Sequence, residues 1–193
     1  MNEYSDTATR ILDAAQQLIQ TKGYNAISFV DIANIVGIKK PSIIHHFSSK
    51  AELGAAVVKR YSESFLMQLE AVANDDQKTS LEAFDLYCSP YQHFSSTDDT
   101  ICLCGALAGE FMALPDDVKK QVSDFFGKHI EWLTMIFERG KNKGELHFSG
   151  PADVLARVVV NALQGAIIVK RASGQHANID HTIALLKTTL TQP

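Results

Sequence analysis

Hydrogen-bond donors crowd a short segment near the start of the chain. They are Lys39, Lys40, Ser42, His45 and His46. Lysine, serine and histidine side chains can all donate to the phosphate oxygens or the base edges of nucleic acid. No acidic residue occurs between Ile32 and Lys50, although the chain as a whole has a formal net charge of −4. The segment is therefore a candidate nucleic-acid surface.

The residues around this segment predict two short helices joined by a tight turn. Ser28 is a good N-cap with Asp31 in the first turn, and Gly37 stands where a left-handed residue must end the first helix. The second helix begins just before Pro41, since proline is tolerated only in a first turn, and runs to Phe47. At about two turns it contributes little core of its own. This is the pattern of a helix-turn-helix, although many helix–glycine–helix pairs in all-α proteins bind nothing.

A longer stretch around the motif follows a known order of elements. It runs from Thr9 to Leu53 and reads TRILDAAQQLIQTKGYNAISFVDIANIVGIKKPSIIHHFSSKAEL. An amphipathic helix is followed by Lys22-Gly23-Tyr24, the helix-turn-helix, His46-Phe47 and Lys50 before a capped long helix. In this order residues 1 to about 61 resemble the N-terminal DNA-binding domain of the TetR/AcrR-type transcriptional regulators. The rest of the chain matches that family only in layout.

The resemblance implies a DNA contact for each motif position. Base edges would be met by Lys40, Pro41, Ser42 and Ile44. The phosphate backbone would be held by Ser28, His45, His46 and Lys50, and Lys39 completes the DNA-binding set. The family usually has tyrosine where Ile44 stands, and often where His46 stands. Ile44 can meet a thymine methyl but cannot bond a phosphate, whereas His46 can still donate to one, more strongly when protonated.

Apolar residues recur at helical spacing along the chain, and alternation of period two is nearly absent. We therefore predict an all-α fold without a sheet. With the resemblance, this becomes an N-terminal three-helix DNA-binding head (1–50), linked by a long helix to a larger helical ligand-binding and dimerisation domain (51–193). Ser49 and Glu52 predict a capping box at the start of the long helix. The helices predicted after it are Ser80–Phe94, Ile101–Ala113, Pro115–Arg139, Ala152–Ser173 and Asn178–Thr191.

The last two predicted helices carry much apolar surface. The first is apolar over much of its circumference, and Ile179, Ile183, Leu186 and Leu190 form a stripe on the second. Gly165 costs about 1 kcal/mol relative to alanine inside a helix, so we expect a close backbone approach there. The periodicity fits one chain's own core equally well. The resemblance implies instead that residues 152–191 pair with their copies in a homodimer, with two heads about 34–36 Å apart to read successive major grooves.

The middle of the chain is rich in aromatic and sulfur side chains, which suit a mostly apolar cavity with few polar anchors. The candidate ligand-binding residues are Phe84, Tyr87, Cys88, Tyr91, Cys102, Cys104, Phe111, His129 and Trp132. His129, Glu110 and Gln164 interrupt apolar faces and are candidate anchors. Plain core is the alternative for any one of them. The resemblance implies a cavity for an unknown small-molecule inducer, whose binding moves the long helix with a coupling of about 1–3 kcal/mol.

Two of the three cysteines suggest a different kind of regulation. Cys102 and Cys104 flank Leu103 at a predicted helix start, where the helix dipole can favour a reactive thiolate. The hypothesis is a thiol-based sensor of electrophiles or oxidants, and the alternative is two small buried hydrophobes. A direct disulfide between residues two apart on a helix is disfavoured. Cys88, His93 and these two cysteines match no tight zinc spacing, so we predict no metal and no cofactor.

Composition and charge bound the remaining possibilities. Residues 1–61 carry +2 (seven basic, five acidic) and the rest −6 (eleven basic, seventeen acidic), which fits a protein that touches DNA with one end. No signal peptide and no uninterrupted apolar run of membrane-spanning length is apparent, which predicts a cytoplasmic protein without a membrane partner. A Cys/His-dependent enzyme is a weaker alternative, because no catalytic or nucleotide-binding motif occurs, and we predict no catalytic residue. A helical scaffold whose head binds protein is a third option.

Overall fold

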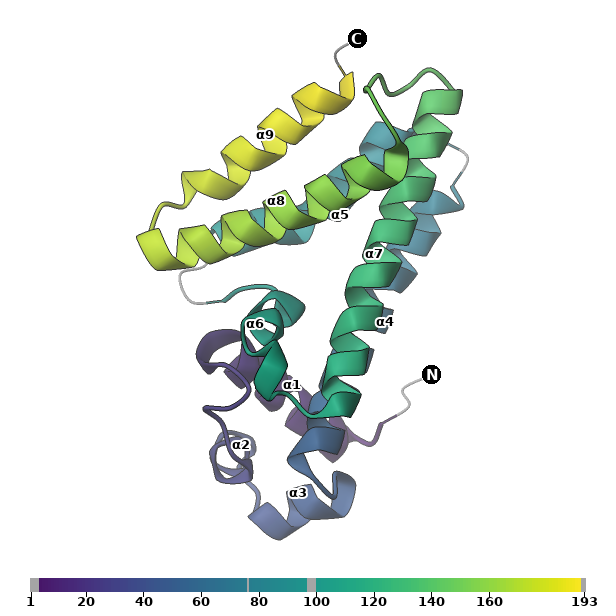
Figure 1. Cartoon of the computed structure of the whole chain (residues 1–193). Coiled ribbons are helices and arrows are strands. Elements are labelled where there is room, and N and C mark those ends of the chain that lie inside the picture. Colours follow the sequence, from purple (N-terminus) through teal and green to yellow (C-terminus); the bar gives the residue numbers. More distant parts are fainter. Residues whose placement is uncertain (1–3, 76, 97–99, 192–193) are drawn as a thin grey trace. The chain divides into compact units, whose positions relative to one another are not determined.

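The computed structural model describes residues 4–75, 77–96 and 100–191, and the regular structure in these ranges is helical throughout. The elements labelled in Figure 1 are α1 (Asp6–Lys22), α2 (Phe29–Val36), α3 (Lys40–His46), α4 (Lys50–Ala73), α5 (Ser80–Ser95), α6 (Leu103–Gly109), α7 (Asp116–Asn142), α8 (Ala152–Ser173) and α9 (Ala177–Thr191), with a short 3₁₀ helix η1 (Phe111–Ala113) between α6 and α7. The predicted all-α fold is confirmed.

The chain forms two compact units. The first comprises residues 1–63 and 103–124, and the second comprises residues 64–102 and 125–193. The helices α4 and α7 each contribute to both units. The functional boundary predicted at residue 50 falls inside the first unit and stays a prediction.

The first unit is built on α1, which packs against α2, α3 and α6. Ile11 and Leu12 of α1 are completely buried, as the amphipathic spacing requires. The helix ends at Gly23, whose φ of 92° is readily adopted only by glycine. Arg60 of α4 donates to the carboxylate of Asp13 at 2.6 Å, which ties α4 to α1. The buried side of α2 and α3 therefore packs on the core formed around α1.

The turn between α2 and α3 has the conformation that its sequence predicts. Ser28 caps α2 and forms a full capping box with Asp31, in which each residue's side chain accepts from the other's backbone N–H. Gly37 ends α2 in the left-handed conformation, with φ 74° and ψ 35°. Its N–H donates to the carbonyl of Ala33 at 2.9 Å. These local contacts fix the angle at which α3 leaves the turn.

In the second unit α8 packs against α9 and α5, and α9 also packs against α5. The end of α4 is tied to α7 by two hydrogen bonds. Trp132 donates its indole N–H to the carbonyl of Leu69 at 3.2 Å, and Arg139 donates to the carbonyl of Ala73 at 2.8 Å. The second bond satisfies a carbonyl of the last turn of α4, which has no partner within its own helix.

Two predicted details of the helices are wrong. The predicted helix Ile101–Ala113 is instead α6 and η1, because the backbone leaves α-helical geometry at Glu110, with φ −107° and ψ 9°. Glycine at Gly109 lowers the cost of that break. At the start of α4, Ser49 accepts from the Glu52 N–H at 3.1 Å as predicted, but the Glu52 carboxylate accepts from Ser48. The capping box with Ser49 is therefore only half formed.

Among the described residues, α8 alone is long and apolar enough to cross a membrane by length and composition. The prediction of no such stretch rested on uninterrupted apolar runs, and polar residues such as Asn161 and Gln164 interrupt this one. A helix in a protein core passes the same test, and α8 packs against two other helices.

Candidate functional site

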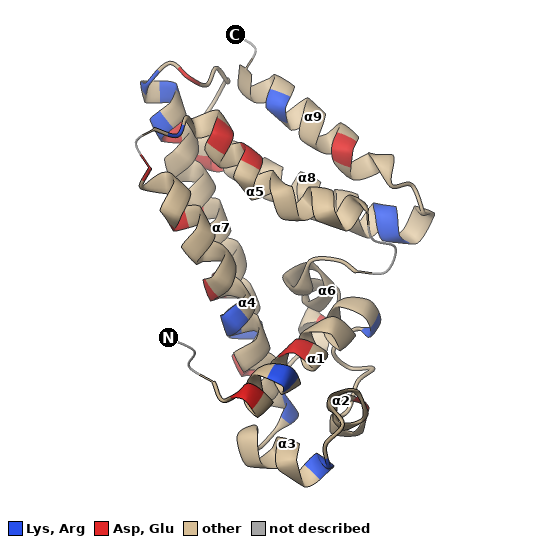
Figure 2. Ribbon diagram, turned by 180° about the vertical axis from the view of Figure 1, so that it is seen from behind, with Lys and Arg blue, Asp and Glu red and all other residues tan. Residues whose placement is uncertain are grey.

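The helix α3 exposes nearly all of its polar residues. Ile43 is the single buried residue of α3, at 0% exposure. Phe47, the first residue after the helix, is also buried. The exposed positions are Lys39, Lys40, Pro41, Ser42, Ile44 and His45, and His46 is half-buried. Figure 2 shows lysine at the start of α3 and no acidic residue on it. The arrangement leaves a donor-rich face that carries two lysines, while the apolar side chains of Ile43 and Phe47 are buried.

Lys50, the first residue of α4, is held by an aromatic ring. Its ammonium lies 4.5 Å from the centroid of the Tyr24 ring, within the range of a cation–π interaction. Burial lowers the pKa of Lys50 from its ordinary value, and the carboxylates of Glu110 and Asp31 act in the opposite direction. The side chain is half-buried, so its position is more restricted than that of a typical surface lysine.

Ser28 is exposed, but its donors are engaged within the capping box. Its backbone N–H and its hydroxyl donate to one Asp31 carboxylate oxygen, at 2.8 and 2.7 Å. The hydroxyl bond is the main reason that the pKa of Asp31 is lowered. A phosphate contact from the Ser28 hydroxyl therefore requires that the box open.

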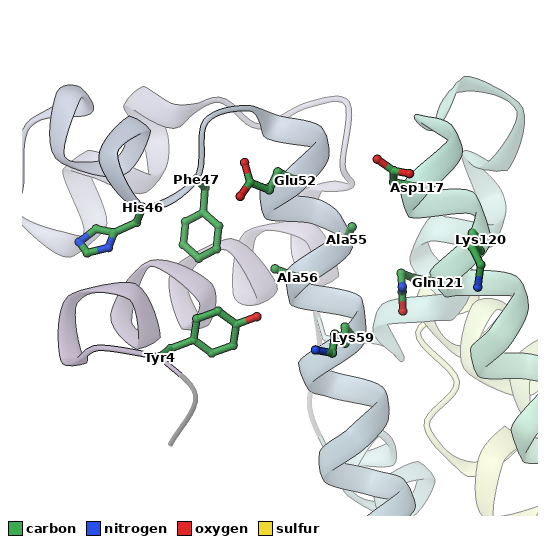
Figure 3. A pocket seen from close by; sticks show the side chains of 10 residues that line it. All are labelled: Tyr4, His46, Phe47, Glu52, Ala55, Ala56, Lys59, Asp117, Lys120 and Gln121. Carbon is green, nitrogen blue, oxygen red and sulfur yellow. The ribbon is translucent and has the colours of Figure 1, made fainter. Parts of the chain in front are cut away.

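A shallow groove of about 420 Å³ lies beside the end of α3 (Figure 3). Figure 3 places His46 and Phe47 on one side of it and the start of α7 on the other. Its lining carries charges of both signs, because Glu52 and Asp117 accompany Lys59 and Lys120. The groove therefore does not extend the positive surface of α3.

The predicted ligand-binding residues are divided between the two units. In the second unit the Tyr87 ring stacks on Trp132 at 5.8 Å between centroids and meets the edge of His129 at 5.6 Å. Cys104 and Phe111 belong to the first unit. Phe84 makes its ring contact with Phe137 at 5.8 Å.

The sequence did not single out two neighbours of His129. Phe125 lies 3.9 Å and Phe65 lies 5.2 Å from the imidazole, measured between ring centroids. Helical spacing identifies a side chain as buried but does not name the polar group that it covers.

Four buried side chains of the second unit are linked in a chain of hydrogen bonds. Gln164 donates through Nε2 to the hydroxyl of Tyr91 at 3.1 Å. Tyr91 hydrogen-bonds to the Tyr87 oxygen, which opposes the rise in the pKa of Tyr87 caused by burial. The Tyr87 hydroxyl lies 3.1 Å from Nδ1 of His129. If Tyr91 donates to the Tyr87 oxygen, the Tyr87 hydroxyl donates its own hydrogen bond to Nδ1 of His129. The single N–H of the neutral imidazole is then at Nε2.

Both ends of this chain are polar atoms that lack a hydrogen-bond partner among the described residues. They are Nε2 of His129, which is a donor in the tautomer described above, and the acceptor Oε1 of Gln164. Burial lowers the pKa of His129 to about 3, so the imidazole is neutral at physiological pH. A buried donor and acceptor without partners cost free energy.

The three cysteines are buried thiols. Burial raises the pKa of Cys88 to about 12, which suppresses the reactive thiolate. Cys102 and Cys104 flank the first residue of α6 as predicted, at 3% and 0% exposure. The sulfur of Cys102 lies 3.4 Å from Nε2 of Gln164. Among the described residues, no group of histidine, cysteine and acidic side chains is arranged to hold a metal ion.

A helix-turn-helix with an exposed basic second helix, followed by a larger helical region, is the architecture of a DNA-binding transcriptional regulator. The family described as "Bacterial regulatory proteins, tetR family" matches residues 11–57. A TetR-family transcriptional regulator from Agrobacterium tumefaciens is 30% identical with a TM-score of 0.89, over 96% of this chain and 98% of that one. A TetR regulator from Legionella pneumophila is 29% identical with a TM-score of 0.87, over 99% and 100%.

A curated relative extends this likeness. The HTH-type transcriptional repressor NemR of Escherichia coli is 21% identical over 197 residues, which span 100% of this chain and 99% of that protein. This chain belongs to the TetR family of bacterial transcriptional regulators. The family resemblance read from the sequence is thereby confirmed.

Proposed function

We propose that this protein is a ligand-responsive repressor that binds a palindromic operator as a homodimer. The observation that carries the proposal is α3, whose polar residues face solvent while Ile43 alone is buried. Lys40 and Ser42 would donate to base edges in the major groove, with Pro41 and Ile44 in apolar contact there. Lys39, His45, His46 and Lys50 would hold phosphates, and Ser28 would join them if its capping box opens.

The homodimer is supported by apolar surface that α8 and α9 leave exposed. Val158, Val169 and Leu185 are 50%, 53% and 68% exposed. They line a groove of about 620 Å³ along the two helices. A second copy would cover this surface in a two-fold interface, in which the same patch meets itself. No described atom of the chain would lie within 4 Å of a Cβ on Gly165, so the close approach predicted there would be made by the partner.

The buried chain from Gln164 to His129 supports a ligand site in the second unit. A ligand with an acceptor for Nε2 of His129 and a donor for Oε1 of Gln164 would satisfy both ends. The rings of Tyr87 and Trp132 would provide the apolar contacts. Since His129 is neutral, the site suits an uncharged molecule. Such a ligand would release DNA only if it binds the non-binding conformation more tightly.

Two alternatives have less support. A thiol sensor needs an accessible thiolate, whereas Cys88, Cys102 and Cys104 are all at most 3% exposed. A Cys/His-dependent enzyme is disfavoured because the relatives are transcriptional regulators. A bacterial transcriptional regulator must reach the chromosome, which lies in the cytoplasm, so we propose a cytoplasmic location.

Selection of bound duplexes from a random DNA pool tests the proposal. A palindromic winner whose binding weakens steeply with added salt is the expected result, because phosphate contacts release counterions. Winners without two-fold symmetry would contradict the homodimeric reading. Absence of binding at low salt would contradict DNA recognition and favour a scaffold whose head binds protein.

A further inference from the structure

Glu110, between α6 and η1, holds a loop of the DNA-binding head that is far away in sequence. Its Oε1 accepts from the backbone N–H of Tyr24 at 2.8 Å. Its Oε2 accepts from the backbone N–H and the side-chain amide of Asn25, at 2.9 and 2.7 Å. One carboxylate therefore receives three donors from the loop between α1 and α2, within the first unit.

The loop begins at a glycine whose conformation suits both the end of α1 and the contact with Glu110. Gly23 has φ 92° and ψ 159°, and a Cβ added to it would collide with the Glu110 carboxylate. Glycine here permits both the positive φ and the close approach of the carboxylate to two successive N–H groups. Charge-assisted hydrogen bonds of this kind are stronger than neutral ones.

The same loop carries the ring beneath Lys50. Tyr24 is 4% exposed, and its ring lies against Gly54 of α4, where a Cβ would come within 2.7 Å of Cε2. The ammonium of Lys50, one turn earlier in α4, lies 4.5 Å from the ring centroid. Glu110 holds the Tyr24 backbone, and the Tyr24 ring holds Lys50.

We infer that Glu110 is a positioning residue for DNA binding, which fixes the Tyr24–Asn25 loop and so keeps Lys50 within reach of a phosphate. Any movement of the α6–η1 segment that withdraws this carboxylate would release the loop and the lysine together. The inference rests on the proposed function, because it assigns a role to Lys50 at DNA.

Glu110→Gln tests the inference with almost no change in size. An amide keeps one acceptor oxygen and loses the other, so at least one of the backbone bonds fails. The substitution also removes a negative charge, which by itself strengthens binding to DNA. The matched control is Glu145→Gln in the second unit, where a carboxylate likewise accepts a backbone N–H, that of Ser80 at 2.6 Å. Both variants change the net charge by the same amount.

The measurement is the affinity for an operator duplex selected from the random pool, over a series of salt concentrations. We expect Glu110→Gln to bind at least about fivefold more weakly than Glu145→Gln, with a salt slope lower by about one, as for Lys50→Ala. The double variant Glu110→Gln, Lys50→Ala should bind no more weakly than Lys50→Ala alone. Circular dichroism establishes that each variant is folded.

The outcomes separate this inference from the proposed function. Wild-type protein that ignores all DNA would remove the proposed function. Operator binding that falls for Lys50→Ala but matches the Glu145→Gln control for Glu110→Gln would overturn the inference alone. If Glu110→Gln does not fold, Asn25→Ala is the substitute, because it removes the side-chain bond to Glu110 at an exposed position. A salt slope of Asn25→Ala equal to that of the wild type would then overturn the inference.

Discussion

His129 is a histidine that the second unit keeps neutral. It is 1% exposed, and the Phe125 and Phe65 rings lie 3.9 and 5.2 Å from it. Burial lowers its pKa to about 3, whereas in the unfolded chain the pKa returns to about 6.5. Below pH 6.5 the unfolded chain therefore binds a proton that the folded chain does not. The stability that the neutral imidazole permits is present above that pH and is lost as the pH falls towards 3.

We predict that the free energy of unfolding falls by roughly 2 kcal/mol between pH 8 and pH 5 because of this one group. This window lies above the ordinary pKa of carboxylates, so acidic side chains contribute little. Urea unfolding at several pH values measures the effect, and His129→Gln should lack it. His147→Gln, at an exposed position, should keep it. If the free energy of unfolding of His129→Gln depends on pH as strongly as that of the wild type, the folded protein does not hold the His129 imidazole in its neutral form.

Single residues of the DNA-binding face differ in what they should contact. Lys50→Ala should weaken binding to all DNA sequences about equally and lower the salt slope by about one, since a phosphate contact is lost. Lys40→Ala or Ser42→Ala should instead change the preference at particular base pairs by roughly 1–3 kcal/mol each. Titration against the operator, single-base variants and random duplex distinguishes them. Equal losses on all duplexes for Lys40→Ala and Ser42→Ala would contradict their base-reading role.

Among the helices, the sequence predicts those boundaries that depend on residues adjacent in the chain. Ser28 and Gly37 bound α2 as expected, because a cap and a left-handed turn depend on a few adjacent residues. The break at Glu110 was not predictable in this way. Its carboxylate meets residues 85 and 86 positions away, and the sequence presents it only as a polar interruption of an apolar face. For the same reason the sequence selects His129, Trp132 and Phe111 alike by residue type, although Phe111 belongs to the first unit and the other two belong to the second.

Two glycines in helical surroundings should respond oppositely to alanine. Gly37→Ala should destabilise the protein by about 1 kcal/mol, because φ 74° is strained for alanine even though no described atom lies within 4 Å of the added Cβ. Gly127→Ala, inside α7 and equally free of contacts, should stabilise it by up to about 1 kcal/mol. Denaturant midpoints of both variants measure the difference. If both variants shift the denaturant midpoint in the same direction, packing and not backbone conformation determines the stability change at one of the two sites.

At the scale of the whole molecule, one helix-turn-helix reaches only one half-site of a palindrome. Two heads must be joined at a fixed separation of about 34–36 Å to read successive major grooves. The joint that we propose is the exposed apolar face of α8 and α9. Operator affinity should therefore depend on residues that never touch DNA.

Leu185→Glu is the sharpest test of that dependence. Leu185 is 68% exposed and lines the α8–α9 groove, so the single chain should fold unchanged while two like charges are buried in a two-fold interface. Met67→Glu, at 67% exposure on α4, introduces the same charge outside α8 and α9. Sedimentation velocity should show monomers for Leu185→Glu and dimers for Met67→Glu, and only the former should lose operator binding. Because each head would then bind independently, the loss should be largest for duplexes with two half-sites and small for a single half-site. A dimeric Leu185→Glu variant would place the interface elsewhere.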